Sequence, residues 1–188
     1  MRDLSLHLMD IIQNSIKAQA SMISTRIIAD KKKDQLMIEI IDNGVGMDQA
    51  LLNQIRDPFV TTRTTRKVGL GIPLLEASAK RAEGEFMIES QKYKGTSIKA
   101  KFKISHIDRL PLGNVAETFM SLVSANKDIN FSLELSNMQE IFKFSVFDVK
   151  NRLNGISIDN IDVLIWIRDY INEGVNNIFG GVLNEILS

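Results

Sequence analysis

Apolar residues recur at helical spacing near the start of the chain, at Leu4, Leu8, Ile11, Ile12 and Ile16. This three-to-four-residue period predicts an amphipathic helix over residues 4–20. Asp3 or Ser5 stands at the position of its N-cap, where a side-chain oxygen can accept from a free backbone N–H.

The next eighty residues alternate apolar, β-branched runs with polar turns. This pattern predicts strands at 22–29, 35–41, 84–90 and 95–104, and helices at 49–54 and 71–82. A lysine-rich turn at 30–34 joins the first two strands as a hairpin. A polar loop rich in Thr and Arg separates the two helices at 57–67.

Residues 105–113, which contain Pro111, predict a boundary. Beyond it the pattern predicts a helix at 114–125, strands at 129–135 and 141–147, a helical piece at 148–153, a helix at 159–173 and an apolar stretch at 175–187. Trp166 and Tyr170 are expected in the core; if they are exposed, they become candidate interface residues.

The second strand ends in Asp-Asn-Gly-Val-Gly-Met at 42–47. The glycines lack a Cβ, so a flat ring can approach the backbone. Asp42 can accept a hydrogen bond from the exocyclic amine of adenine, whereas guanine presents a carbonyl there, so we expect a preference for ATP over GTP. Taken alone, Asp42-Asn43-Gly44 is also an ordinary turn sequence.

A second glycine motif, Val-Gly-Leu-Gly-Ile-Pro at 68–73, opens the helix expected at 71–82. Free backbone N–H groups and the helix dipole favour phosphate at such a position. An acidic strand end and a glycine-rich helix start together indicate a nucleotide held at both ends.

The first helix carries Asp10, Asn14 and Lys17 on one stripe. An amide oxygen of Asn14 can ligate Mg²⁺, Lys17 can place a charge near phosphate, and Asp10 can orient or deprotonate a water near the γ-phosphate. Without the glycine motifs, the same stripe would be read as a solvated polar face.

With these motifs in order, the sequence resembles the GHKL superfamily of DNA gyrase, the ninety-kilodalton heat-shock chaperones, histidine kinases and MutL. The similar segments are the N box at 7–17, the first glycine box at 42–46, the F box at 57–59, the second glycine box at 69–71 and a last box at 95–96. Residues 1–104 carry all of these boxes.

The resemblance implies a Bergerat-type α/β two-layer sandwich, a mixed sheet with helices on one face, followed by a small αββα extension at 105–188 of unnamed role. It implies ATP and Mg²⁺ as cofactors, Asn14 as the metal ligand and Asp10 as the catalytic base. The implied nucleotide contacts are Asn14, Lys17, Asp42, Gly44, Gly46, Met47, Arg66, Lys67, Gly69, Leu70, Gly71 and Thr96. Thr96 would support the contact between adenine and Asp42, and residues 60–68 would form the ATP lid.

Two features depart from the better-known members. Sensor histidine kinases place a helical hairpin with the phosphoacceptor histidine before this module; here the N box opens the sequence, so we expect no such hairpin, as in the anti-sigma-factor kinases. Gyrase, MutL and the chaperones carry a glutamate four residues before the Asn, where this chain has the shorter Asp10. A kinase-like or ATP-hydrolysing module, and a nucleotide-gated protein-binding switch, both remain open.

Composition limits the classes of partner and the cellular compartment expected for this domain. Lys+Arg 23 balances Asp+Glu 23 and cysteine is absent, so no global charge points to nucleic acid and no disulfide or thiolate metal site is expected. No apolar run approaches the ~20 residues that cross a bilayer. We expect a cytoplasmic protein that acts with a protein partner, with self-association left open.

Overall fold

The computed structural model describes residues 2–56 and 70–180. The expected lid and F box, together with Arg66, Lys67 and Gly69, lie outside the described residues.

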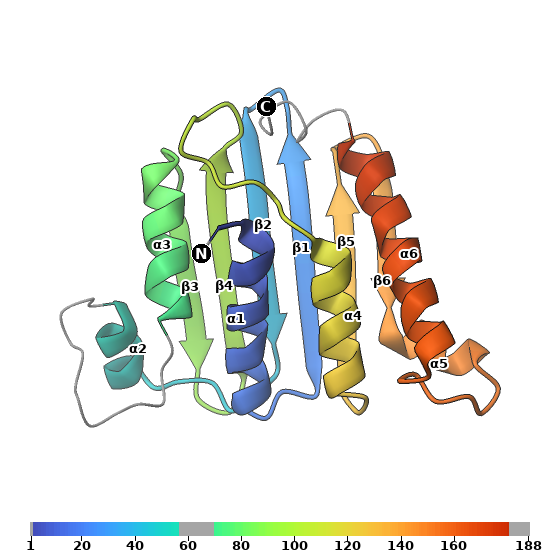
Figure 1. The fold of residues 1–188 in the computed structure, drawn as a ribbon. Helices are drawn as coiled ribbons and strands as arrows, with labels where there is room; N and C mark the ends of the chain where they lie inside the picture. The colour runs from blue at the N-terminus through green and yellow to red at the C-terminus, as the bar shows by residue number, and fades with distance from the viewer. Residues whose placement is uncertain (1, 57–69, 181–188) are drawn as a thin grey trace.

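One sheet of six strands forms the back layer of the molecule (Figure 1), with the order β3-β4-β2-β1-β5-β6. The strands are β1 (Met22–Asp30), β2 (Gln35–Asp42), β3 (Phe86–Gln91), β4 (Gly95–Lys103), β5 (Asn130–Ser136) and β6 (Ile141–Ser145). β1 and β5 pair in parallel, with Met22 opposite Asn130, and all other neighbours are antiparallel. The sheet is therefore mixed.

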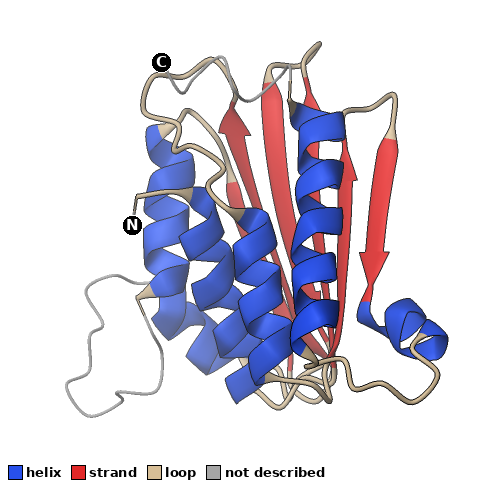
Figure 2. Cartoon of the chain, turned by 45° about the vertical axis from the view of Figure 1, so that its right-hand side comes forward, coloured by secondary structure: helices blue, strands red, loops and turns tan. Residues whose placement is uncertain are grey.

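The described residues also form six helices: α1 (Leu4–Lys17), α2 (Gln49–Arg56), α3 (Gly71–Arg81), α4 (Val115–Ala125), α5 (Val146–Arg152) and α6 (Ile161–Phe179). Figures 1 and 2 show α1, α3, α4 and α6 side by side on one face of the sheet. The predicted fold class is confirmed: two layers, a mixed sheet and helices on one face. The C-terminal part follows the predicted helix–strand–strand–helix order and ends in one more helix, α6.

The helix-free face of the sheet carries charged side chains among apolar ones, because the strands alternate. Along β1, alternate residues from Ile23 to Ala29 are buried, while Arg26 points to the other side. There Arg26 pairs with Glu39 of β2, and the Lys99 Nζ lies 2.9 Å from the other Glu39 oxygen. A buried carboxylate flanked by two cations lets this face meet water without exposing the core.

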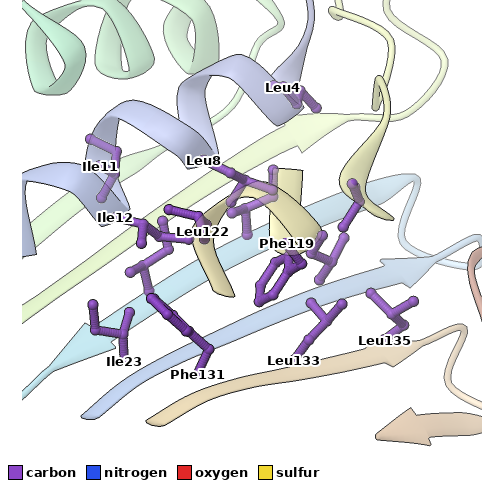
Figure 3. Close-up of a cluster of buried hydrophobic side chains, with 14 of the residues drawn as sticks. Leu4, Leu8, Ile11, Ile12, Ile23, Phe119, Leu122, Phe131, Leu133 and Leu135 are labelled. Carbon is purple, nitrogen blue, oxygen red and sulfur yellow. The ribbon is translucent and has the colours of Figure 1, made fainter. Parts of the chain in front are cut away.

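A shared hydrophobic core joins the first and last parts of the chain. Figure 3 shows Leu8 and Ile12 of α1 beside Phe119 of α4, over Phe131 of β5. Phe119 is fully buried and Phe131 is 1% exposed. The expected boundary near residue 105 falls between β4 and α4, but the sheet and core continue across it. Division into two domains stays a prediction.

Several element bounds differ from the sequence expectation. α1 stops at Lys17 rather than residue 20, and its N-cap is Asp3, whose Oδ1 accepts from Leu6 N at 3.0 Å. β6 stops at Ser145, because the Ser145 side chain caps α5, so residues 146–147 are helical instead of strand. α6 continues through Gly174 to Phe179.

The expectation that Trp166 and Tyr170 lie in the core is wrong. Their exposed fractions are 50% and 36%. α6 turns Leu164, Ile167 and Ile171 toward the sheet, and these residues satisfy the apolar period of the helix. The two aromatic residues therefore lie on the flank of α6.

Candidate nucleotide-binding site

A hollow of about 240 Å³ opens between the C-terminal half of α1, the loop after β2 and the start of β4. Six of the predicted site residues line it: Asn14, Lys17, Asp42, Gly46, Met47 and Thr96. They come from three elements that are distant in sequence, and the antiparallel pairing of β2 with β4 places Thr96 opposite Asp42.

Asp42 is buried, with an exposed fraction of 8%, at the end of β2. Its Oδ2 accepts a 2.6 Å hydrogen bond from Ser15 Oγ, and its Oδ1 accepts a 2.9 Å bond from Gly44 N–H. These donors fix the plane of the carboxylate. Because each carboxylate oxygen can accept more than one hydrogen bond, Asp42 keeps acceptor capacity for a ligand amine.

Ser15 is a site residue that the sequence reasoning missed. It follows Asn14 on α1, and it lies one turn after Ile11 on the buried side of the helix. The apolar spacing of α1 could have identified it, because a polar residue on the buried face of an amphipathic helix requires a hydrogen-bond partner. That partner is Asp42, 27 positions away.

The loop after β2 is fixed by backbone contacts on both sides. Val45 N–H donates to Ala18 O at 2.8 Å, and Met47 N–H donates to Ser90 Oγ at 2.9 Å. Gly46 has φ +61°, and a Cβ there would collide with the carbonyl of Gln91. Glycine is therefore required by both conformation and space, as expected for a loop that brings its backbone close to neighbours.

Ser90 on β3 also holds Thr96. The two hydroxyl oxygens lie 2.9 Å apart, and the Ser90 hydroxyl contacts Gly95 O at 3.0 Å. The sequence reasoning missed Ser90. The predicted turn near residues 92–94 could have identified Ser90, because a tight turn there places Ser90 opposite Thr96 in the hairpin.

Two of the three residues on the polar stripe of α1 line the hollow. Asn14 and Lys17 line the hollow, whereas Asp10 lies one turn earlier, next to the start of α3. A Cβ added at Gly71 would be 3.0 Å from the Asp10 Cβ. Within residues 2–56 and 70–180, the side chains of these three α1 residues have no hydrogen-bond or ion-pair partner, so they are available to a ligand.

The start of α3 has no side-chain cap, since its N-cap residue is Leu70. By contrast, α1, α4, α5 and α6 are each capped by a polar side chain. The first N–H groups of α3 therefore lack a side-chain acceptor among the described residues, which favours an anion. Leu70 and Gly71 do not line the hollow themselves, but Ile72, one residue later, does.

The rest of the wall is apolar. Side chains from α1, the glycine loop, α2, α3 and β4 contribute Ile11, Val45, Leu51, Ile55, Ile72 and Ile98. Sequence reasoning did not assign them to the site. Val45 and Ile72 stand inside the glycine motifs, and the other four are typical of ordinary amphipathic patterns. An apolar slot with one oriented carboxylate matches a flat, partly polar ring.

The described residues contain no cluster of three or more His, Asp or Glu side chains that could hold a metal ion. A site for Mg²⁺ would thus rest on the Asn14 amide oxygen together with ligand phosphates and water. Mg²⁺ commonly binds in this way, with few protein ligands. Among the helices of the described part, none has the length and hydrophobicity of a membrane-spanning segment.

Comparison with known proteins identifies a matching family over the first part of the chain. The profile of the histidine kinase-, DNA gyrase B- and HSP90-like ATPases matches residues 2–106. A protein named as a sensor in Shewanella frigidimarina is 35% identical over 103 residues, which are 54% of this chain and 16% of that protein. Sporulation kinase C of Bacillus subtilis is 36% identical over 87 residues, 46% of this chain and 20% of the kinase.

Among solved structures, the Aquifex aeolicus MutL ATPase domain complexed with ADP aligns with a TM-score of 0.49 and 12% identity, over 73% of this chain and 61% of that one. The chain aligns with only about a fifth or less of the length of the two relatives above. The family match nevertheless covers more than half of this chain. The chain therefore belongs to the family of histidine kinase-, DNA gyrase B- and HSP90-like ATPases.

Proposed function

We propose that this protein binds ATP together with Mg²⁺ in the hollow between α1, the loop after β2 and β4. The observation that carries the proposal is the buried Asp42 carboxylate, fixed by Ser15 and Gly44 on the wall of an otherwise apolar slot. Adenine would donate its exocyclic amine to Asp42. Thr96, held by Ser90, would support this contact from the neighbouring strand.

The triphosphate would extend toward α1 and the start of α3. Asn14 would hold Mg²⁺ through its amide oxygen, and the bound cation would neutralise phosphate charge. Lys17 would add a cationic contact, and the uncapped N–H groups near Gly71 would donate to phosphate oxygens. Gly44, Gly46 and Met47 would supply the backbone next to the base; Arg66, Lys67, Gly69 and Leu70 complete the proposed contact set.

We propose that Asp10 is the general base of a kinase-like or ATP-hydrolysing reaction. It lies on the same face of α1 as Asn14 and next to the first residue of α3. In this role its carboxylate would accept a proton from the attacking water or hydroxyl. The module would act on or through a protein partner in the cytoplasm.

A nucleotide-gated binding switch is the second candidate. It is favoured by one observation: Asp10 does not line the hollow that contains Asp42 and Asn14. In this case ATP would change partner affinity by binding one conformation better than another, and turnover would be incidental.

Incubation with γ-labelled ATP separates these candidates. Release of free phosphate that Asp10→Asn abolishes supports hydrolysis, and label on an added protein supports a kinase. Saturable binding with neither outcome supports the switch. Absence of any adenine-nucleotide affinity in folded protein with Mg²⁺ would refute the proposed function as a whole.

Asp42→Asn tests the adenine contact. The amide places N–H groups where the base amine donates, so ATP binding should weaken by about 1–3 kcal/mol in calorimetry. Asp128→Asn, an exposed site on the turn after α4, is the matched control and should bind as the unmodified protein. Equal ATP affinity in the Asp42 and Asp128 variants would refute the assignment of Asp42.

A further inference from the structure

A second and larger hollow, of about 490 Å³, lies between β6, α5 and α6. Its apolar wall comes from all three elements: Phe144, Val149, Leu153, Val163, Trp166 and Tyr170. We call it the aromatic groove. It is separate from the nucleotide site, with which it shares no lining residue.

The aromatic residues Trp166 and Tyr170 of the groove stack on each other and are also exposed to solvent. The Trp166 and Tyr170 rings stack with centroids 5.1 Å apart and planes at 8°, and Tyr170 packs on Phe142 at 4.9 Å. Half of Trp166 nevertheless meets solvent. A stacked tryptophan–tyrosine pair on the wall of an open groove is typical of a protein-binding surface, because these residues supply large contact area at low entropic cost.

The groove follows the border of the sheet that is unpaired among residues 2–56 and 70–180. β6 is the last strand in the order, and Figure 2 shows it at the border, with α6 in front and α5 at its end. Asn137 N–H donates to Glu140 O, so these two residues form a hydrogen-bonded pair of the β5–β6 hairpin, and every second pair along it is hydrogen-bonded as well. By this alternation Phe142 and Phe144 bond to β5, while the backbone N–H and C=O groups of Ile141 and Lys143 point outward.

The charge at the centre of this border favours a partner segment over a second copy. Lys143 is 70% exposed and lies 3.4 Å from Glu134 of β5. Two-fold antiparallel pairing of β6 with itself about its central residue would set two Lys143 side chains directly opposite each other, which is repulsive. An acidic residue at that position of an added strand would instead complement Lys143.

We propose that an extended segment of a partner protein adds to β6 as a seventh strand. Its backbone would bond to Ile141 and Lys143. Alternate apolar side chains would enter the aromatic groove, and an acidic side chain on the other face would lie opposite Lys143. The proposal does not depend on nucleotide binding, so its failure and that of the proposed function are distinguishable.

Trp166 allows a direct test, because it is the only tryptophan of the chain. The probe is a synthetic peptide of about eight residues, the length of an ordinary strand, with valine at alternate positions and a central glutamate on the opposite face. It is titrated into the nucleotide-free protein. We expect a saturable blue shift of Trp166 emission, as the indole leaves water.

Two altered peptides separate strand addition from unspecific apolar contact. A peptide with proline at a pairing position cannot donate that backbone bond and should bind about tenfold or more weakly. A peptide with central lysine should bind roughly two- to fivefold more weakly than the glutamate peptide. Lys143→Glu should reverse this preference, whereas Lys32→Glu, on the exposed β1–β2 turn, should leave it unchanged.

Three results would overturn the proposal. The first is no saturable change of Trp166 emission with the glutamate peptide. The second is equal affinity for the proline peptide, which would mean that the groove binds apolar groups without strand pairing. The third is a concentration-dependent dimer in ultracentrifugation whose formation shifts Trp166 emission without peptide, which would assign the groove to a second copy.

Discussion

The hollow at α1 and the aromatic groove lie beside helices of the same layer, yet they are built differently. The proposed nucleotide site uses small residues and placed polar atoms: Gly46 lies close to a neighbouring carbonyl, and Ser15 donates a 2.6 Å hydrogen bond to Asp42. The aromatic groove uses bulky rings that support one another, such as Trp166 on Tyr170. The first arrangement suits a small polar ligand of defined shape, and the second suits a larger apolar surface.

This difference follows the family match. Residues 2–106, which match the family, contain every described residue of the proposed nucleotide site, while the groove belongs to residues 143–170. β5 and β6 extend the sheet at the border away from β3, and none of their residues lines the first hollow. One sheet thus carries two hollows with separate linings.

The largest expected effect concerns the core beneath both regions. Phe119→Ala removes a fully buried ring that packs on Phe144 and lies over β5, so it should lower the free energy of unfolding by about 3–5 kcal/mol. If the two parts form one cooperative unit, urea unfolding followed by circular dichroism and by Trp166 emission should give coincident curves. Separate curves would support the division near residue 105.

Gly174→Ala acts on the groove side alone. A Cβ at this position would lie 2.6 Å from the Phe142 ring, so the ring or the strand β6 that carries it must shift. Overpacking of about 1–3 kcal/mol outweighs the gain of about 1 kcal/mol in helix propensity, and we expect a net loss of about 1 kcal/mol in stability. Trp166 emission should change and ATP affinity should not; Glu173→Ala, exposed on the same helix, should alter neither.

Ser15→Ala is the converse change, confined to the nucleotide site. Asp42 loses one of its two donors, so we expect ATP binding to weaken by about 1 kcal/mol in calorimetry. Trp166 emission should stay constant. Ser121→Ala, exposed on α4, is the matched control. A loss of ATP affinity as large for Ser121→Ala as for Ser15→Ala would contradict a specific role of Ser15.

The smallest effect concerns acid sensitivity at the buried His7 of α1. Burial lowers the pKa of His7, whose Nδ1 has no hydrogen-bond partner among the described residues. The unfolded chain therefore takes up a proton before the folded one, and the free energy of unfolding should fall as pH drops from about 7.5 to 5.5. Urea titrations at both values should show a flatter dependence for His7→Met; an equal slope would exclude His7 as the source.

Local patterns predicted most of the elements. The period of apolar residues in α1, and the alternation in β4, each follow from one buried face, and each was recognised within a few residues of its observed bounds. The polar stripe of α1 and the acidic end of β2, interpreted together with the glycine motifs, predicted that Asn14, Lys17 and Asp42 lie in one site, and all three line the hollow. Short-range spacing carries this information because each motif occupies the end of a single element.

Contacts between residues far apart in the sequence could not be predicted from the local spacing of apolar residues or motifs. The parallel pairing of β1 with β5 has no local signature, and so the continuity of the sheet beyond residue 105 was not predicted. The bond from Ser15 to Asp42 likewise depends on how α1 lies on the sheet. Trp166 was misplaced because α6 carries more apolar residues than its buried stripe needs.

The pairing of β1 with β5 has a consequence for synthesis on the ribosome. β1 forms its hairpin with β2 early, but its other border waits until β5 has been made, more than a hundred positions later. During this interval the second border of β1 lacks its pairing with β5, and an open strand invites wrong partners. A nascent chain halted before residue 130 should accordingly be a good client for chaperones that recognise unpaired apolar strands.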